Sequence, residues 1–419
     1  MEKNTAKQII LEYQQIAVNV ELVKRSLELS EALNYVLVGL RRVGKSYLLY
    51  QQVQHLVALG HSVEEILYFN FEDDRLGCLS LADLDLIKTC YEEMFSHRPI
   101  FFLDEIQNVE GWERFARRLV DQKYLVNITG SNSRMLSTEI AGTLGGRYMV
   151  QSVHPYSFEE FLAAGGISLA ENWELSPVKN DVVRNFDTYL RHGGLPELVQ
   201  VPPRLKRTWL SNLYNKIFFG DMLVRHQVRN ALALKVLIRK LAESVKQPCS
   251  FTRLAQVVSS AGTKVRVETV IDYVEYAKES CLIFEVENYA AKIAEKVSNK
   301  KYYFADNGIL NLFLLDPEAS LLENLVAVRL HSLCDDVCFF KSGFEVDFYL
   351  WEREIAIQVA WSLKEPATVE REVGALKKLA LLHPVRRMMI VTSDEAGTLA
   401  GASCEVEVVP AWRFLLSPL

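Results

Sequence analysis

One short segment restricts the fold of this chain more than any other. The apolar run 35–38 leads directly into Gly39-Leu40-Arg41-Arg42-Val43-Gly44-Lys45-Ser46, and residues 47–59 have the apolar spacing of a helix. The eight residues match the pattern G-x-x-x-x-G-K-[ST]. Its glycines let backbone N–H groups point at an anion, and the helix that follows adds its positive N-terminus. A strand, this loop and a helix in that order predict a phosphate-binding loop in an α/β fold.

The residue types at the end of this loop have specific chemical roles. We predict that Lys45 reaches the β- and γ-phosphates of ATP and that the Ser46 hydroxyl ligates Mg²⁺. The alternative is a glycine-rich turn without function, which the flanking strand and helix argue against. The predicted nucleotide-binding residues are Gly39, Leu40, Arg41, Arg42, Val43, Gly44, Lys45, Ser46 and Tyr47.

A pair of acids supports the same interpretation independently. Asp104 and Glu105 directly follow the apolar run 100–103. Ligands of open α/β sheets bind at the carboxyl ends of the strands, so both acids are expected close to the loop. We predict that Asp104 holds Mg²⁺ and that Glu105 orients and deprotonates the attacking water. Taken alone, the pair also fits a strand that ends in solvated acids.

Length and composition describe a soluble globular protein of several domains. The 419 residues argue for two to four domains, and 49% hydrophobic and 24% charged residues are ordinary values. No apolar run is long enough to cross a bilayer, and the N-terminus opens an amphipathic helix rather than a signal peptide. A net charge of −6 does not indicate a nucleic-acid coat. Seven scattered cysteines predict reduced thiols in a cytoplasmic protein: 78, 90, 249, 281, 334, 338 and 404.

Strand and helix patterns alternate through the first part of the chain. A helix is expected over 6–30 and another over 112–122, and strands over 35–38, 66–71, 100–103, 124–129 and 147–153. This alternation predicts a parallel, doubly wound sheet.

Three further regions follow the sheet. Helices over 155–225 are expected to form a lid. Helices over 231–246, 251–260 and 266–280 and strands over 282–286 and 301–306 suggest a winged helix. An α/β pattern then returns, with helices over 320–333 and 368–382 and strands over 337–340, 345–351, 355–360, 387–392 and 405–409.

At this point the chain resembles a known group of proteins. Residues 30–160 look like the AAA+ superfamily of P-loop ATPases, and more narrowly like bacterial and archaeal ATPases with three motifs. These are the loop at 39–46, the acidic motif 103–107 (Leu-Asp-Glu-Ile-Gln) and 129–133 (Thr-Gly-Ser-Asn-Ser). The C-terminal half resembles the domain of uncharacterised function usually attached to such ATPases. The resemblance implies ATP and Mg²⁺ as ligands.

The same resemblance implies three more site residues. A γ-phosphate sensor is expected among Thr129, Ser131 and Asn132, with Asn132 preferred, although these residues also suit a helix cap. Arg147 stands where such ATPases place an arginine that neutralises the transferring phosphoryl group, often across a subunit interface, and the alternative is a structural pair with an acid. Pro196, in 192–196 (His-Gly-Gly-Leu-Pro), is expected near the adenine, although the segment also suits a plain turn.

The C-terminal region also resembles the PD-(D/E)XK nuclease core. Glu323 and Asp347 match the first two acids of that family's metal site. Gln358 and Ala360 stand where the family has Glu-x-Lys, so a weaker ligand replaces a carboxylate and a cation is missing. The resemblance therefore implies a vestigial site and a nuclease-like fold without nuclease activity, with an active nuclease as the less favoured alternative.

These observations predict a magnesium-dependent ATPase that acts as a multidomain switch. The expected domains are 1–154 (AAA+ core), 155–229 (helical lid), 230–305 (winged helix) and 306–419 (nuclease-like). The alternative is a DNA-binding protein ordered by ATP. The presumed recognition helix is acidic, so the basic clusters 204–207 and 225–229 are the better candidates for DNA contact, or else solvated helix faces. A homo-oligomer is also a candidate assembly, and no membrane contact is expected.

Overall fold

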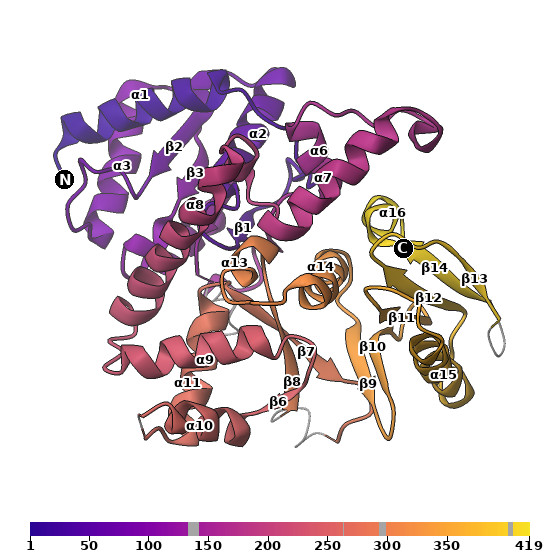
Figure 1. Ribbon diagram of the computed structural model, residues 1–419. Helices are drawn as coiled ribbons and strands as arrows, with labels where there is room; N and C mark the ends of the chain where they lie inside the picture. Colours follow the sequence, from indigo (N-terminus) through magenta and orange to yellow (C-terminus); the bar gives the residue numbers. More distant parts are fainter. Residues whose placement is uncertain (133–141, 263, 293–298, 401–404) are drawn as a thin grey trace. The chain divides into compact units, whose positions relative to one another are not determined.

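The computed structural model describes residues 1–132, 142–262, 264–292, 299–400 and 405–419. Their contacts divide them into two units (Figure 1). Unit 1 comprises Met1–His154 and Glu279–Cys281, and unit 2 comprises Pro155–Lys278 and Leu282–Leu419. Ser133, the last residue of the predicted 129–133 motif, and Cys404 lie outside the described residues.

Unit 1 is built on a parallel five-stranded sheet with the order β2-β3-β4-β1-β5. Strands β1 to β4 are buried along nearly their whole length, as expected for a sheet covered on both faces. The predicted parallel α/β sheet is thereby confirmed. The strands are β1 (Tyr35–Val38), β2 (Ile66–Asn70), β3 (Ile100–Asp104), β4 (Val126–Gly130) and β5 (Met149–Ser152).

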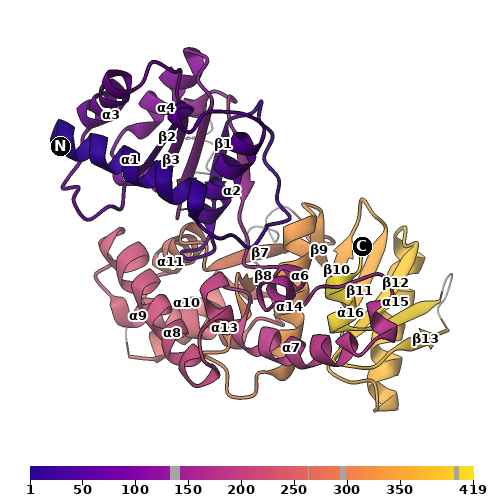
Figure 2. The ribbon, with the colours of Figure 1, turned by 90° about the horizontal axis from the view of Figure 1, so that it is seen from above.

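Helices cover this sheet, and α1 packs against β2, α2 and α3 (Figure 2). They are α1 (Lys3–Asn19), α2 (Lys45–Ala58), α3 (Leu81–Met94) and α4 (Trp112–Asp121), with short 3₁₀ turns at Val63–Glu65 and Ile106–Asn108. The predicted helix over 6–30 is wrong beyond Asn19. The Gln54 side chain on α2 donates to the carbonyls of Ala17 and Val20, which satisfies the end of α1 and lets the chain continue as an extended segment.

Unit 2 begins with helices and continues into a large sheet. The helical elements are α6 (Phe158–Ala164), α7 (Val178–His192), α8 (Pro203–Lys216), the π-helical segment Ile217–Val224, α9 (Ala231–Glu243), α10 (Phe251–Ser260), α11 (Val267–Glu279), α13 (Asn307–Leu310), α14 (Glu318–Leu333), α15 (Pro366–Leu382) and α16 (Ala411–Leu416), with 3₁₀ turns at Trp173–Leu175 and Pro196–Val199. Helices α6 and α7 pack against α16, and α7 packs against α13 and α14. The predicted lid helices therefore share contacts with the C-terminal helices of their own unit.

The sheet of unit 2 has nine strands in the order β13-β14-β12-β11-β10-β9-β7-β8-β6. Strand β7 pairs with β8 on one side and with β9 on the other, so the two strands predicted to form a wing and the C-terminal strands belong to one continuous sheet. The boundary predicted at 305/306 falls in the chain between β8 and β9 of this sheet, and it stays a prediction. The strands are β6 (Cys249–Ser250), β7 (Ile283–Asn288), β8 (Asn299–Phe304), β9 (Val337–Lys341), β10 (Glu345–Leu350), β11 (Ile355–Val359), β12 (Arg387–Thr392), β13 (Gly397–Leu399) and β14 (Val406–Pro410).

Two negative findings hold for the described part of the chain. None of its helices combines the length and the apolar character that a membrane span requires. No disulfide bond joins the six cysteines of this part.

Candidate functional site

The loop between β1 and α2 is shaped by its two glycines. A Cβ atom on Gly39 would lie 2.2 Å from the Val153 carbonyl oxygen, so only glycine allows this approach. Gly44 has a φ of 94° and caps the N-terminus of α2 in the left-handed region. Among the described residues no side chain caps this helix end. The first N–H groups of α2 are therefore suited to an anion.

Lys45 is buried at the base of the loop and 4% exposed. Its ammonium donates to the carbonyl oxygens of Gly39 (3.1 Å) and Leu40 (3.3 Å). The same Nζ lies 3.3 Å from Glu105 Oε1. The structure thus brings the predicted phosphate-binding lysine, at the start of α2, and the second predicted acid, directly after β3, into contact.

Asp104, at the end of β3, is fully buried and hydrogen-bonded on both oxygens. Thr129 Oγ1 contacts Oδ1, the Tyr68 hydroxyl donates to Oδ2 at 2.9 Å, and Ser46 also bonds this carboxylate. Burial and the neighbouring charge of Glu105 raise the pKa of Asp104, although these three hydrogen bonds lower it. A divalent cation would offset both causes, and a hydroxyl beside a carboxylate is a suitable oxygen donor pair for Mg²⁺.

Glu105 has a φ of 56°, in the left-handed region of backbone conformation that residues other than glycine rarely adopt. Its backbone N–H donates to Thr129 Oγ1 at 2.9 Å, which holds this conformation. Its side chain accepts from Gln107 and from the Ser131 N–H. Burial raises the pKa of Glu105, but the charge of Lys45 and these hydrogen bonds outweigh it, so the net pKa is below the usual value. An ionised, positioned carboxylate is what a general base requires.

Arg25 is a site residue that the sequence did not reveal. It lies in the extended segment after α1 and is 7% exposed. Its guanidinium donates to the Val43 carbonyl in the loop (3.1 Å) and to the His154 carbonyl at the end of the sheet (2.7 Å). The predicted helix over 6–30 concealed it, because a helical residue 25 would have had no reason to reach the loop. Arg25 joins the phosphate loop to the segment that follows β5.

We expect Arg25→Ala to lower both stability and nucleotide affinity. One buried and one partly buried carbonyl would lose a charged donor, which costs about 2 kcal/mol of unfolding free energy, and a loosened loop would raise the ATP Kd about 10-fold. Chemical denaturation and an ATP titration measure the two effects. Arg117→Ala, which removes an exposed arginine on α4, is the matched control and should change neither. Equal behaviour of the two variants would contradict the role of Arg25.

The three sensor candidates differ in environment. Thr129 is fully buried and bridges Asp104 and Glu105, and the Ser131 backbone N–H contacts Glu105. Asn132 is partly exposed at the end of the described segment. The role of Asn132 as a phosphate sensor stays a prediction. The bridging role of Thr129 was not foreseen.

Arg147 does not lie beside the phosphate loop of its own chain. It precedes β5, which runs parallel to β1 in the register Tyr35↔Met149, and so lies at the amino ends of the strands. The loop follows the carboxyl ends, about 13 Å away along strands of four residues. Arg147 Nε pairs with Asp121 Oδ1 at 2.7 Å, which is the structural alternative. This position does not favour a role for Arg147 at the loop of its own chain, and its role at the site, within one chain or across a subunit interface, stays a prediction.

Pro196 belongs to unit 2, and its contact with adenine stays a prediction. The glycines before it have a defined structural role. Gly193 has a φ of 77°, and a Cβ there would lie 2.1 Å from Asp306 Oδ2. The Gly194 N–H donates to that oxygen at 2.8 Å, and the N–H groups of Gly308 and Ile309 donate to Oδ1. This segment therefore binds the buried Asp306 carboxylate at the start of α13.

Asp306 should give the protein a distinct pH dependence of stability. Burial raises the pKa of Asp306 to about 6, although its backbone hydrogen bonds lower it. The unfolded chain releases this proton near pH 3.9, so the contribution to unfolding free energy is full below about pH 4 and declines by roughly 3 kcal/mol as the pH rises to about 6. Denaturation of the wild type and of Asp306→Asn across that range measures both unfolding free energies. The wild-type value minus the variant value should fall as the pH rises. Asp187→Asn, which removes an exposed carboxylate, should keep the wild-type pH dependence. If the wild-type value minus the Asp306→Asn value stayed constant or rose with pH, the raised pKa of Asp306 would be contradicted.

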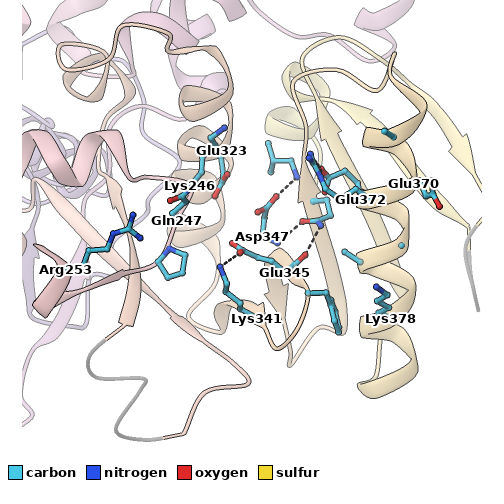
Figure 3. Close-up of a pocket in the computed structure, with 18 residues that line it drawn as sticks. Lys246, Gln247, Arg253, Glu323, Lys341, Glu345, Asp347, Glu370, Glu372 and Lys378 are labelled. Atoms are coloured by element: carbon cyan, nitrogen blue, oxygen red, sulfur yellow. Dashed lines mark hydrogen bonds and ion pairs between the residues drawn. The ribbon is translucent and has the colours of Figure 1, made fainter. Parts of the chain in front are cut away.

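The predicted vestigial residues also come together, in unit 2 (Figure 3). Glu323 on α14, Asp347 on β10 and Gln358 on β11 line one cavity of about 1140 Å³. The Asp347 N–H donates to Gln358 Oε1 at 2.8 Å, so this amide oxygen is already bonded. The cation expected to be missing because of Ala360 is supplied from another strand: the Lys301 ammonium of β8 contacts Glu323 and Asp347.

Two family models match the chain. Residues 32–162, which include the whole sheet of unit 1, match an AAA domain. Residues 183–319 match a domain of unknown function, DUF8612. That second match begins before the C-terminal half, for which the uncharacterised domain was predicted, and covers the first part of that half. The likeness of residues 306–419 to nucleases stays a prediction.

Solved structures with a similar arrangement are only distantly related. A Walker-type ATPase of Pyrococcus abyssi is 14% identical, with a TM-score of 0.38 over 74% of this chain and 95% of that one. The Orc1 protein of Aeropyrum pernix, solved with DNA, is 15% identical, with a TM-score of 0.32 over 78% of this chain and 94% of that one. Scores this low carry no conclusion about function.

Two relatives are about twice as similar in sequence, at 30% and 31% identity. An uncharacterized protein of Haemophilus influenzae is 31% identical over 79% of this chain and 83% of its own length. The uncharacterized protein MJ1544 of Methanocaldococcus jannaschii is 30% identical over 98% of this chain and 95% of its own length. With its AAA domain at residues 32–162, the chain belongs to the same family as this archaeal protein and is a P-loop ATPase of the AAA type.

Proposed function

We propose that this protein hydrolyses ATP with Mg²⁺ at the loop between β1 and α2. The observation that carries the proposal is the direct contact of Lys45 with Glu105, beside the bond between Ser46 and Asp104. One phosphate-binding cation, one general base and one pair of metal-binding oxygens thus converge from α2 and β3.

Each residue has one role in this proposal. The uncapped N–H groups at the start of α2 and the Lys45 ammonium bind the phosphates. Ser46 and Asp104 hold Mg²⁺, which supplies charge neutralisation at the phosphate oxygens. Glu105 accepts the proton of the attacking water. Tyr68 and Thr129 fix the Asp104 carboxylate, and Thr129 also fixes the backbone of Glu105.

The test is ATP binding and turnover by the full chain and by Lys45→Ala. We expect the variant to lose ATP affinity and to reduce turnover to the background level, because its remaining phosphate donors are neutral backbone N–H groups. Lys88→Ala, which removes an ion-paired lysine on α3, is the control and should hydrolyse ATP at the wild-type rate. Equal turnover by all three proteins would refute the proposal.

The consequence of hydrolysis belongs to the same proposal. ATP would change the arrangement of unit 2 relative to unit 1, so that the chain acts as a switch. Support comes from the division into two units, each with its own sheet. Limited proteolysis of the full chain with and without ATP tests it, since identical cleavage patterns in both states would contradict a switch.

DNA binding is not favoured by the candidate surfaces. Helix α11 carries Glu268, Asp272 and Glu275, which repel phosphates. In the basic cluster 204–207, Lys206 is buried and donates to the Leu198 carbonyl, so it is not available to a DNA backbone.

DNA binding by a cleavage-inactive unit 2 therefore remains the alternative prediction. A DNA titration at two salt concentrations tests it, because phosphate contacts strengthen as salt falls.

A further inference from the structure

One buried lysine in unit 2 contacts three acids that line the cavity. Lys301 is 0% exposed, and its Nζ lies 3.0 Å from Glu345 Oε1, 3.1 Å from Glu323 Oε1 and 3.3 Å from Asp347 Oδ1. The three carboxylates come from α14 and from β10, and they line a cavity of about 1140 Å³ (Figure 3). Three carboxylates around one cation are more than an ion pair needs, and they resemble the oxygen shell of a metal ion.

The backbone directs these acids to one point. The register of β10 against β9 shifts between Val346 and Tyr349, which is a bulge. Asp347 lies in this bulge, and bulges redirect side chains out of the normal alternation. Its Oδ2 accepts the Val359 N–H at 2.9 Å, while its Oδ1 is left for Lys301. The arrangement is therefore specified by the strand and is not a chance meeting of surface side chains.

Other donors occupy further oxygens of the cluster. The Tyr303 hydroxyl donates to Glu323 Oε1 at 2.9 Å, and Lys341 donates to Glu345 Oε2 at 2.7 Å. Across the described ranges, no group of three or more His, Cys, Asp or Glu side chains is arranged to hold a metal ion. Contacts of 3.0–3.3 Å suit N–H···O bonds, whereas Mg²⁺ or Ca²⁺ would need oxygens at about 2.0–2.6 Å.

We infer that the Lys301 ammonium occupies a cation site formed by Glu323, Glu345 and Asp347, in the place that a divalent metal ion would otherwise take. The protein supplies its own cation there, so the wild-type cluster needs no metal. Removing the ammonium leaves three carboxylates that repel one another, with Glu323 buried and Glu345 and Asp347 partly buried, and a divalent cation is the simplest group that restores the balance.

The experiment compares the full chain with Lys301→Met and with the control Lys300→Met, in the absence of nucleotide. Lys300 precedes it on β8 but pairs with Glu285 and Glu287 instead. Mn²⁺ binding is measured by electron paramagnetic resonance, and thermal unfolding is followed with and without Mn²⁺. We expect Lys301→Met alone to bind one additional Mn²⁺ and to gain about 2 °C or more in Tm with the ion.

The inference that Lys301 takes the place of a metal ion is overturned if Lys301→Met binds no more Mn²⁺ than the wild type. It is also overturned if the wild type binds an ion that Asp347→Asn removes. Where Lys301→Met does not fold without metal, Mn²⁺ added during refolding should restore soluble protein, and failure of Mn²⁺ to do so equally overturns the inference. These outcomes are independent of ATP turnover in unit 1, so they do not depend on the function proposed there.

Discussion

Glu105→Gln should reduce ATP turnover by about 10²–10⁴-fold while leaving ATP affinity within a factor of about three of the wild type. Glutamine keeps the size of the side chain and can still accept from the Ser131 N–H, which lies 3.2 Å from the carboxylate. It cannot take a proton from water. The phosphate donors, in contrast, are on Lys45 and at the start of α2, and they stay in place.

The same variant loses the charged partner of Lys45, which lies 3.3 Å from Glu105. Without that partner the ammonium is freer to bind phosphate, so any change in affinity should be toward tighter binding. Steady-state turnover and an equilibrium ATP titration separate the two effects. Glu110→Gln, an exposed acid five residues further on, is the control. Turnover by Glu105→Gln at the rate of this control would exclude Glu105 as the base.

The sheet of unit 1 and the core of its site could be predicted because their signals are local. A buried parallel strand is an unbroken apolar run, and Gly39, Gly44 and Lys45 lie in one motif. Asp104 and Glu105 follow an apolar run of the same kind, and parallel topology brings them to the same edge of the sheet. In each case the sequence order alone determines which residues meet.

The residues that were missed act through distant contacts. Arg25 reaches His154, and Tyr68 reaches Asp104, across separations that no periodicity encodes. The apolar spacing of residues 20–30 resembled a helix, but side chains of α2 bond the backbone of that segment instead. Lys301 looked like one end of a strand, and only the pairing of β7 with both β8 and β9 places β8 in the sheet that carries Asp347.

Arg147 shows the limit of transferring a position from a resemblance. Its place in the sequence, just before the fifth strand, matched the expectation, but strand register puts it at the opposite edge of the sheet from the loop. The pair with Asp121 then accounts for it within one chain. A sequence position therefore predicts a role only after it is known whether the residue lies at the amino or the carboxyl ends of the strands.

Gly39→Ala should lower ATP affinity at least about 10-fold and reduce the unfolding free energy by about 1–3 kcal/mol. The added Cβ would lie 2.2 Å from the Val153 carbonyl oxygen, which is backbone and cannot rotate away. The N–H of Val153 is itself bonded to the Val38 carbonyl at 2.7 Å, so residue 153 is held against β1. The strain must therefore move the phosphate loop, and with it the N–H groups that face the phosphates.

Gly77→Ala is the matched control, because a Cβ on Gly77 meets no atom within 4 Å and should change neither quantity. An ATP titration and chemical denaturation of both variants measure the two effects. Wild-type affinity in Gly39→Ala would mean that the close approach of the loop to the segment after β5 does not determine nucleotide binding.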